Sequence, residues 1–520
     1  MAATAAFGPA AERLGASDLD AILSRALPDR RFVVVSNREP YEHYWDEAAE
    51  SVAVRRPAGG LVAALDPLMQ AVGGVWIAWG SGDRDREEVD ERARLRVPPE
   101  QPGYTLRRLW LTPQDINQYY YGYSNQVLWP LCHLRPALTR IRAKYWNGYV
   151  QVNRRFAEAV LDETEAGRAA AVWFQDYHLA LAPAHVRSRR PDLTLSHFWH
   201  IPFPPLEIFR VASHAADLLR GLIANDIVGF HLPLFADNFL RCTESLLPDL
   251  RVDWERRAVD VDGHSCYVRA FPISIDIDEF RQAALRPNAD ARVARLRARY
   301  APGDTLFGIS VDRIDYSKGL EEKLKAIDVM FDCHPELRER FTFVQIAVPS
   351  RTGIDTYDWL NEKIERAVWS INDRWSAGGW QPVHLLKESL SQERLADFYR
   401  AADVCLVTSL QDGMNLVAKE FLACQVDDPG GVLLLSRFAG AAEELDGAFE
   451  VNPYDPEATA EALRAALLMS ADERRERMRR LHASLRTIYD WMGEIFEVWG
   501  EVARGGVAPL SSADMWSRTR

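Results

Sequence analysis

The run LFGISVDRIDYSKG occupies residues 306–319 and joins a strand-forming segment to a charged turn. Residues 306–311 are mostly apolar, and the turn ends in a glycine from which a helix can start. The run VCLVTSLQDGMNLVAKE, residues 404–420, repeats this arrangement further along the chain. Polar turns at the carboxyl ends of two strands, each opening a helix, indicate an open α/β sheet that binds a phosphorylated ligand there.

The residue types in these two turns suit a nucleoside diphosphate. Arg313 and Lys318 can neutralise a diphosphate, and the backbone N–H groups of residues 415–417 can donate to its oxygens. Glu420 follows one helical turn later, where a carboxylate suits a ribose diol. The sequence therefore predicts an anion-binding cleft.

Composition limits the class of protein. The chain has 520 residues, 48% of them hydrophobic and 26% charged, which predicts a folded protein of two or more domains. A net charge of −13 without a basic stripe argues against nucleic acid as a partner. No apolar run approaches the ~20 residues of a membrane helix, and the first 30 residues lack the apolar core of a signal peptide, so we expect a cytoplasmic protein without membrane contact.

The cysteines are scattered and show neither CxxC nor His-rich spacing, which predicts buried thiols of a reducing compartment and no zinc site. They are Cys132, Cys242, Cys266, Cys333, Cys405 and Cys424.

Strand-like and helix-like segments alternate along the whole chain, which indicates parallel sheets covered by helices. We therefore predict an α/β fold of two Rossmann-like, doubly wound domains facing across a cleft, with a boundary in residues 275–292. The polar, aperiodic segment 39–56 predicts a mobile loop. The expected strands are Phe32–Ser36, Val75–Trp79, Ala171–Phe174, Leu195–His200, Ile227–Phe230, Val268–Phe271, Leu306–Val311, Phe343–Ile346, Val383–Leu386, Val404–Thr408 and Val432–Leu435.

Further polar residues follow the strands of the N-terminal half. Arg38 ends the first strand, residues 57–60 form a glycine-rich turn before a helical run, and Asp176 and His200 each follow a strand. The aromatic stretch 119–129 lies near the same predicted edge. Aromatic faces beside carboxylates and amides suit a polyhydroxylated sugar.

These motifs, taken together, resemble the trehalose-6-phosphate synthase family, retaining GT-B glycosyltransferases that join a nucleotide-activated glucose to glucose 6-phosphate. The resemblance runs from about Phe32 to about Asp490. It implies an N-terminal extension (1–30), an acceptor-binding domain (31–280), a nucleotide-sugar-binding domain (281–490), and a C-terminal helix with a tail (491–520) that crosses back to the first domain. The motifs are Val35–Arg38, Ala58–Leu61, Ser124-Asn125 with Leu128–Pro130, Asp176–Leu179, His200–Pro204, Arg313–Gly319, Ser350-Arg351 and Asp412–Glu420.

The resemblance also implies roles for single residues. The acceptor contacts would be Arg38, Tyr120, Trp129, Asp176 and Arg351. The donor contacts would be Gly59, Gly60, His200, Arg313, Lys318, Asp412, Gly413, Met414, Asn415, Leu416, Val417 and Glu420. The catalytic set would be Asp176, His200, Arg313, Lys318 and Asp412. Neither a cofactor nor a metal is expected, because two cations neutralise the leaving group.

Two departures from the family pattern leave the choice of nucleotide open: Gln411 replaces an arginine, and Leu390 stands where an aromatic residue often faces the base. The longer loop after Arg38 resembles the glucosylglycerol-phosphate synthases, which use glycerol 3-phosphate, whereas Tyr120 and Arg351 fit a sugar phosphate better. A catalytically silent, sugar-phosphate-sensing homologue is a third reading, which the intact donor residues disfavour. A homo-oligomer is compatible with the sequence.

Several candidates also have a purely structural reading. His178 is expected to pack beneath the sheet edge, Asp176 could cap the next helix, and His200 could be a core histidine. Arg313 and Lys318 could form a solvated charged turn. The motif that opens the helix after Asp412 favours a role for Arg313 and Lys318 in binding a diphosphate.

Overall fold

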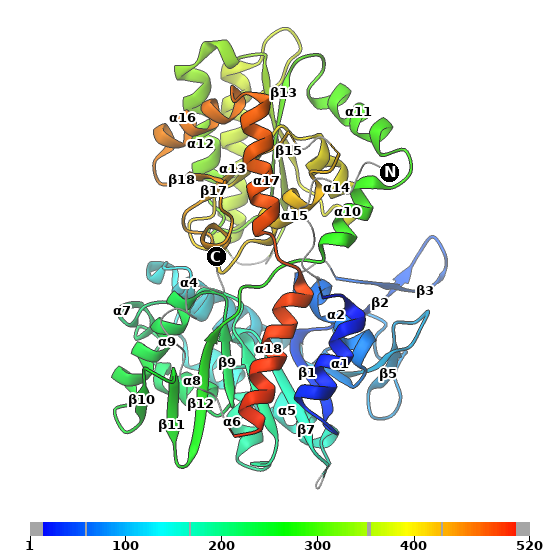
Figure 1. Cartoon of the computed structure of the whole chain (residues 1–520), viewed down its shortest axis with the longest axis vertical. Coiled ribbons are helices and arrows are strands. Elements are labelled where there is room, and N and C mark those ends of the chain that lie inside the picture. The colour runs from blue at the N-terminus through cyan, green and yellow to red at the C-terminus, as the bar shows by residue number, and fades with distance from the viewer. Residues whose placement is uncertain (1–13, 58–59, 166–167, 351–354, 428–429, 506–520) are drawn as a thin grey trace. The chain divides into compact units, whose positions relative to one another are not determined.

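The computed structural model describes residues 14–57, 60–165, 168–350, 355–427 and 430–505. They form two compact units. The C-terminal unit comprises residues 274–487, and the N-terminal unit comprises residues 14–273 together with 488–505. Each unit alternates strands and helices around a largely parallel sheet, as Figure 1 shows, so the predicted α/β class is confirmed.

The N-terminal unit contains a ten-stranded sheet, in which all neighbours from β12 to β6 are parallel and the flanking strands pair antiparallel. The order runs outward from β1 in two directions, to β4 on one side and to β7 on the other. The switch point therefore lies between β1 and β7. In spatial order the strands are β10 (Arg251–Asp253), β11 (Ala258–Val261), β12 (His264–Ala270), β9 (Ile227–Phe230), β8 (Thr194–Phe198), β7 (Ala170–Gln175), β1 (Arg31–Arg38), β4 (Val75–Trp79), β6 (Tyr104–Leu109) and β5 (Arg94–Val97).

The longer helices of this unit alternate with the strands and pack on the sheet and on one another. They are α1 (Ala16–Ala26), α2 (Gly60–Val72), α5 (Ala143–Glu163), α8 (Ala215–Leu222), α9 (Pro233–Leu246) and α18 (Ile488–Ala503). Shorter helices are α3 (Pro113–Asp115), α4 (Trp129–Cys132), α6 (Ala182–Arg187) and α7 (Leu206–Phe209).

The C-terminal unit contains a six-stranded, wholly parallel sheet whose switch point lies between β13 and β16. β13 and β14 are buried along nearly their whole length, as expected for parallel strands covered on both faces. In spatial order the strands are β15 (Val383–Leu386), β14 (Phe341–Val348), β13 (Leu306–Arg313), β16 (Val404–Val407), β17 (Val432–Ser436) and β18 (Phe449–Val451).

The helices of the C-terminal unit cover this sheet. The apolar faces of α12, α13 and α16 share one core with the strands, which includes Ile327, Ile364 and Leu463. The helices are α10 (Ile277–Leu285), α11 (Ala289–Tyr300), α12 (Leu320–Cys333), α13 (Asp355–Trp375), α14 (Gln392–Ala401), α15 (Leu416–Cys424), α16 (Pro456–Leu467) and α17 (Ala471–Ser484).

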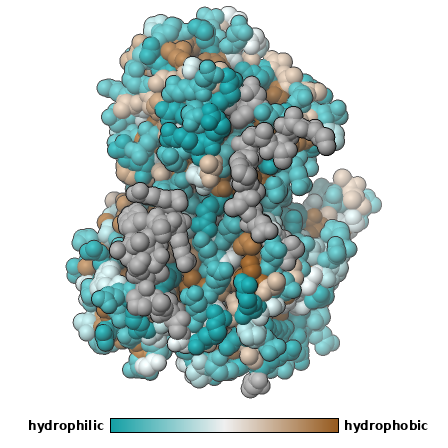
Figure 2. Space-filling view, in the orientation of Figure 1, coloured by the Kyte–Doolittle hydropathy of each residue, from teal (hydrophilic) through white to brown (hydrophobic). Residues whose placement is uncertain are grey.

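The outer surface over α17 is hydrophilic (Figure 2). This helix buries only Met478, Leu481 and His482, so it packs against the rest of the unit along one narrow stripe of side chains. No helix in the described part of the chain is long and apolar enough to cross a membrane.

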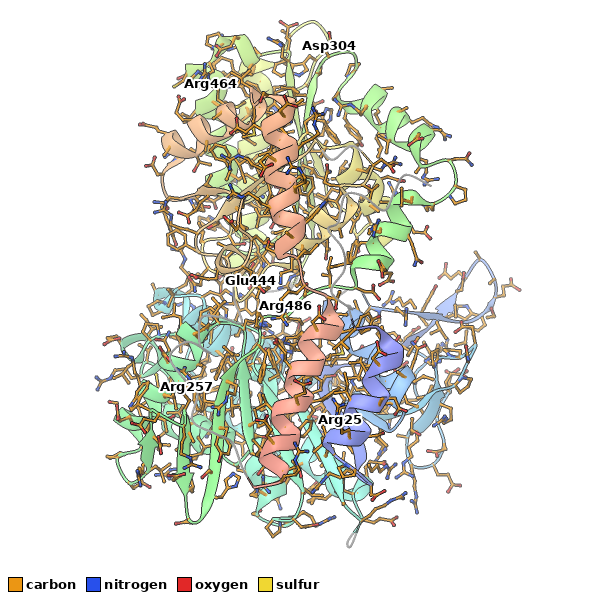
Figure 3. The ribbon with its side chains drawn as sticks, viewed as in Figure 1. Arg25, Arg257, Asp304, Glu444, Arg464 and Arg486 are labelled. Carbon is orange, nitrogen blue, oxygen red and sulfur yellow. The ribbon has the colours of Figure 1, made fainter. Side chains whose placement is uncertain are left out.

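The last helix, α18, belongs to the N-terminal unit. Its rings pack on the sheet: Phe496 lies 5.8 Å from Phe32, and Trp491 lies 5.6 Å from Trp173, between ring centroids. Trp499 is fully buried in the same cluster. α1 packs alongside α18, and Arg25 on its outer side lies 4.0 Å from Glu497 (Figure 3). Aromatic burial therefore joins the end of the chain to its first strand.

Two predictions about local structure are wrong. The segment predicted as a mobile loop forms an antiparallel hairpin, β2 (Glu42–Asp46) with β3 (Ser51–Arg55). The prediction that all cysteines are buried fails at Cys333, which is exposed at the end of α12, whereas the other five are buried free thiols.

Candidate active site

In the C-terminal unit, the turn after β13 is fixed by a buried aspartate. Asp315 is fully buried and accepts hydrogen bonds from the backbone N–H and the hydroxyl of Ser317, at 2.9 and 2.8 Å. Its other oxygen accepts from the Tyr357 hydroxyl at 3.2 Å. The turn then ends at Gly319, whose φ of +64° is a left-handed conformation suited to glycine. Lys318 is therefore held on a rigid turn.

This turn brings two predicted site residues into contact. The Lys318 ammonium donates to Asp412 Oδ2 at 2.5 Å, and both side chains are mostly shielded from solvent. The same carboxylate oxygen accepts from Ser409 Oγ at 3.1 Å and from Asn415 Nδ2 at 3.0 Å. Arg313, the last residue of β13, is exposed at the start of the turn. Cations and a fixed carboxylate therefore lie at the switch point of the sheet.

Helix α15 begins at Leu416, directly after this cluster. Asn415 precedes it with φ of +79°, and Gly413 and Met414 are buried beneath it. The first N–H groups of a helix have no intrahelical acceptor, and the helix dipole favours an anion there. The predicted diphosphate contacts at Leu416 and Val417 are therefore at the start of the helix, next to Lys318 and Asp412.

Glu420 lies one turn into α15. Its Oε2 accepts a hydrogen bond from the Tyr399 hydroxyl at 2.8 Å, and Tyr399 itself is fully buried on α14. Burial raises the pKa of Glu420 to about 7, and the bond from Tyr399 partly opposes that rise. The sequence analysis missed Tyr399, because an isolated tyrosine in a helical run carries no motif.

In the N-terminal unit, the acceptor candidates lie at the switch point between β1 and β7. Arg38 ends β1, and its Nη2 donates to the Tyr120 hydroxyl at 3.1 Å. The Tyr120 ring stacks on His178 with centroids 5.8 Å apart and also contacts Trp79. His178 is buried, as its structural reading predicted.

Tyr120 belongs to an unusual element, the π-helix η1 (Ile116–Leu128). Two side-chain amides support it, since Asn125 donates to the Tyr120 carbonyl at 2.8 Å and Gln126 to the Tyr121 carbonyl at 3.0 Å. π-Helical turns are rare and frequently occur at functional sites. Trp129 follows this helix and is only 5% exposed, stacked on His133, so its predicted acceptor contact stays a prediction.

A buried polar network centred on Arg108 fixes the backbone after Arg38. The fully buried Arg108 donates to Glu39 Oε2 at 2.7 Å and to the Tyr41 carbonyl at 2.8 Å. It also pairs with Asp85 at 2.8 Å. Burial raises the pKa of Glu39 to about 9, and hydrogen bonding to Asp85 adds to that rise. This network anchors the segment that leads into the β2–β3 hairpin, and no pattern in the sequence predicted it.

Asp176 follows β7 in a strained backbone conformation, with φ of +69° and ψ of 170°. Few non-glycine residues adopt this region unless their surroundings hold them there. Its N–H donates to the Phe198 carbonyl at 2.6 Å, and its carbonyl accepts from the ring of His197 at 3.1 Å. Its side chain accepts from the His200 backbone N–H at 3.2 Å. Strand β8 therefore imposes this geometry.

His200 follows β8 and stands beside Asp176. Its Nε2 lies 2.9 Å from Gln175 Oε1, and its ring lies 5.4 Å from that of His231. Burial, with His231 and His197 adding to its effect, holds the pKa of His200 well below the ordinary value. The imidazole is therefore neutral at physiological pH.

The remaining predicted residues are placed as follows. Gly60 begins α2 and is exposed, whereas Gly59 and Arg351 lie outside the described residues. Within the described part of the chain, three or more His, Cys, Asp or Glu side chains nowhere converge in a way that could hold a metal ion.

Several known proteins are similar to this chain in sequence or structure. The trehalose-6-phosphate synthase of Mycobacterium avium (strain 104) is 41% identical over 462 residues, which cover 86% of this chain and 91% of that protein. The crystal structure of an α,α-trehalose-phosphate synthase (UDP-forming) from Burkholderia vietnamiensis superposes with a TM-score of 0.80 at 34% identity, over 90% of this chain and 99% of that chain.

A third protein was solved with a ligand. It is an α,α-trehalose-phosphate synthase (UDP-forming) from Burkholderia xenovorans, in complex with glucose-6-phosphate. It superposes with a TM-score of 0.79 at 30% identity, over 90% of this chain and 99% of that chain. The profile of glycosyltransferase family 20 matches residues 30–499, which include every predicted site residue. This chain belongs to glycosyltransferase family 20.

Proposed function

We propose that this chain transfers glucose from a nucleoside-diphosphate-glucose to glucose 6-phosphate with retention, which makes trehalose 6-phosphate. The observation that carries the proposal is a polar cluster at the switch point of each sheet, Lys318 with Asp412 in one unit and Arg38 with Tyr120 in the other. Two relatives support the proposal. The Mycobacterium avium protein is named a trehalose-6-phosphate synthase, and the Burkholderia xenovorans protein was solved with glucose-6-phosphate.

The C-terminal cluster suits the donor. Arg313 and Lys318 would neutralise the diphosphate, with the N-terminus of α15 donating to its remaining oxygens. Lys318 would then exchange its bond to Asp412 for one to phosphate. Asp412 would be released to accept hydroxyl hydrogens of the glucose, while Glu420 would accept from the ribose. These interactions need no metal ion.

The N-terminal cluster suits the acceptor. The Arg38 guanidinium can bind a phosphate dianion through two parallel N–H groups. The ring of Tyr120 offers an apolar face to a pyranose, and Asp176 offers a carboxylate to a sugar hydroxyl. Glycerol 3-phosphate has no ring to occupy such a face.

The reaction would proceed on one face of the donor sugar. The bond from the glucose anomeric carbon to the diphosphate breaks, and the bond to the anomeric oxygen of glucose 6-phosphate forms on the same side. The proton of that hydroxyl passes to the departing phosphate oxygen. Arg313 and Lys318 stabilise the negative charge that grows on the leaving group, which lowers the barrier.

A product analysis tests the proposal. The purified chain would be incubated with UDP-, GDP- or ADP-glucose, each with glucose 6-phosphate, glycerol 3-phosphate or free glucose, and the products identified by NMR. We expect α,α-linked trehalose 6-phosphate, and a kcat/KM for glucose 6-phosphate at least about tenfold above that for glycerol 3-phosphate, or about 1.4 kcal/mol of discrimination. Preferred transfer to glycerol 3-phosphate would favour the glucosylglycerol-phosphate reading, and no transfer from any donor would favour a silent homologue.

A further inference from the structure

Gln175 is a fully buried polar residue at the site that the proposed reaction does not use. It ends β7, directly before Asp176, and none of its side chain is exposed. Its Oε1 lies 2.9 Å from Nε2 of His200, which follows the neighbouring strand β8. Two adjacent strands therefore bring a buried amide against the imidazole of a candidate catalytic residue.

The chemistry of this contact determines which ring nitrogen carries the hydrogen. A side-chain amide oxygen can only accept, so Nε2 of His200 must be protonated to donate to it. Because the imidazole is neutral, its Nδ1 then keeps a lone pair and can accept a hydrogen bond. The hydrogen bond from Nε2 to Gln175 thus leaves Nδ1 as a hydrogen-bond acceptor.

Burial keeps the ring of His200 uncharged, and the His231 ring, and more weakly that of His197, oppose a further positive charge. The Asp176 carboxylate accepts a hydrogen bond from the backbone N–H of His200 at 3.2 Å. The uncharged rings of Phe198 and Trp491 lie 4.7 and 6.3 Å from the imidazole, between ring centroids.

We propose that Gln175 is a positioning residue that fixes His200 as the neutral Nε2–H tautomer and thereby presents an unprotonated Nδ1 at the glucosyl site. The proposal rests on the proposed function and on the prediction from sequence that His200 contacts the donor. A glycosyl transition state gains positive charge on the sugar ring, and a neutral imidazole beside it avoids the repulsion that an imidazolium would cause.

Two substitutions separate positioning from packing. Gln175→Leu removes the acceptor, so we expect kcat to fall about tenfold or more at every pH while both Michaelis constants change less than about threefold. Gln175→Glu keeps an acceptor but adds a negative charge, which stabilises the imidazolium. We expect its kcat to be low at neutral pH and to recover as the pH rises, an ionisation that the wild type lacks.

Gln70→Leu serves as the control. It removes an exposed side-chain amide that donates to Asp66 at 2.9 Å, and we expect its pH profile to match that of the wild type.

A spectroscopic readout does not depend on activity. In the ¹⁵N-histidine NMR spectrum of the full chain, with the resonance of His200 assigned by its loss in His200→Phe, we expect the Nε2–H tautomer in the wild type and an altered state in Gln175→Leu. A Nδ1–H tautomer in the wild type, an unchanged kcat in Gln175→Leu, or a Gln175→Glu pH profile that matches the wild type would overturn the proposal. If the wild type made no trehalose 6-phosphate, the proposed function would fail, yet the tautomer measurement would still decide whether Gln175 fixes the ring.

Discussion

At the scale of single residues, the site depends on polar side chains held by partners that are themselves buried. Asp315 holds the turn that carries Lys318, Tyr399 holds Glu420, and Gln175 contacts His200. A carboxylate or imidazole positioned in this way loses little conformational entropy when a substrate binds.

As the proposed ribose contact, Glu420 would make donor binding depend on pH. Burial raises its pKa to about 7, so the carboxylate is ionised above that pH and protonated below it. Because only the ionised form accepts hydrogen bonds with both oxygens, we expect the Michaelis constant for the nucleotide-sugar to rise as the pH falls from about 8 to 6. Steady-state kinetics across this range would measure it.

Two variants control for other ionisations. Glu420→Gln should remove this pH dependence. Tyr399→Phe should move it to higher pH, since loss of the hydroxyl removes a bond that stabilises the carboxylate. If the wild-type Michaelis constant for the nucleotide-sugar did not change with pH, the assignment of Glu420 as a donor contact would be wrong.

At the scale of elements, strand ends and the turns that follow them create the site, and close backbone contacts fix those turns. A Cβ atom built on Gly319 would lie 2.1 Å from the carbonyl oxygen of Thr408, the residue that follows β16. The turn after β13 can therefore approach β16 only with glycine at this position, and this approach brings Lys318 to Asp412.

Gly319→Ala should consequently disturb both stability and donor binding. The positive φ alone costs alanine roughly 1–2 kcal/mol, and the clash adds to that cost. We expect a lower melting temperature and a raised donor Michaelis constant. The matched control is Gly303→Ala, because Gly303 has φ of +66° but no atom within 4 Å of its Cβ position. Equal effects of the two substitutions would show that the contact with Thr408 is unimportant.

The packing of α18 is a second element-scale test. Trp499 is fully buried, 6.3 Å from Phe32 between ring centroids, so Trp499→Ala should cost about 3–5 kcal/mol and lower the melting temperature. Trp369→Ala, at a tryptophan that is 68% exposed, should have little effect by the same measurement. If the two variants melted alike, α18 would not stabilise the unit as described.

Sequence patterns predicted the central strands well, because parallel strands buried on both faces leave apolar runs such as Val75–Trp79, which matches β4 at both ends. They failed where stability comes from partners distant in the chain. The β2–β3 hairpin appears polar and aperiodic, yet Arg108, 69 residues after Glu39, anchors the segment that leads into it. Tyr399 and the strained backbone of Asp176 could not be predicted for the same reason. Lys318 and Asp412 could be predicted because each follows a strand within a recognisable motif.

At the scale of the whole molecule, one family 20 chain carries two sheets, each with a polar cluster at its switch point. In the proposed reaction, the donor would bind at β13 and β16 and the acceptor at β1 and β7. Side-chain cations would neutralise the leaving group.

The assignment of cations predicts that a chelator leaves activity intact. In the proposed reaction, Arg313 and Lys318 would supply the positive charge that a divalent ion provides in metal-dependent transferases. Initial rates with and without excess EDTA should agree. Loss of activity with EDTA that magnesium or manganese restores would contradict this part of the mechanism.

The assignment of the acceptor to the Arg38 cluster and of the donor to the Lys318 cluster can be tested by measuring the Michaelis constants of Arg38→Ala and Lys318→Ala for both substrates. Arg38→Ala should raise the constant for glucose 6-phosphate by roughly ten- to a hundredfold, the loss of about 1.5–3 kcal/mol of charge-assisted bonding, while the donor constant changes little. Lys318→Ala should raise the donor constant instead and lower kcat. If both variants weakened the same substrate, or if neither constant moved, the assignment of the two clusters would be wrong.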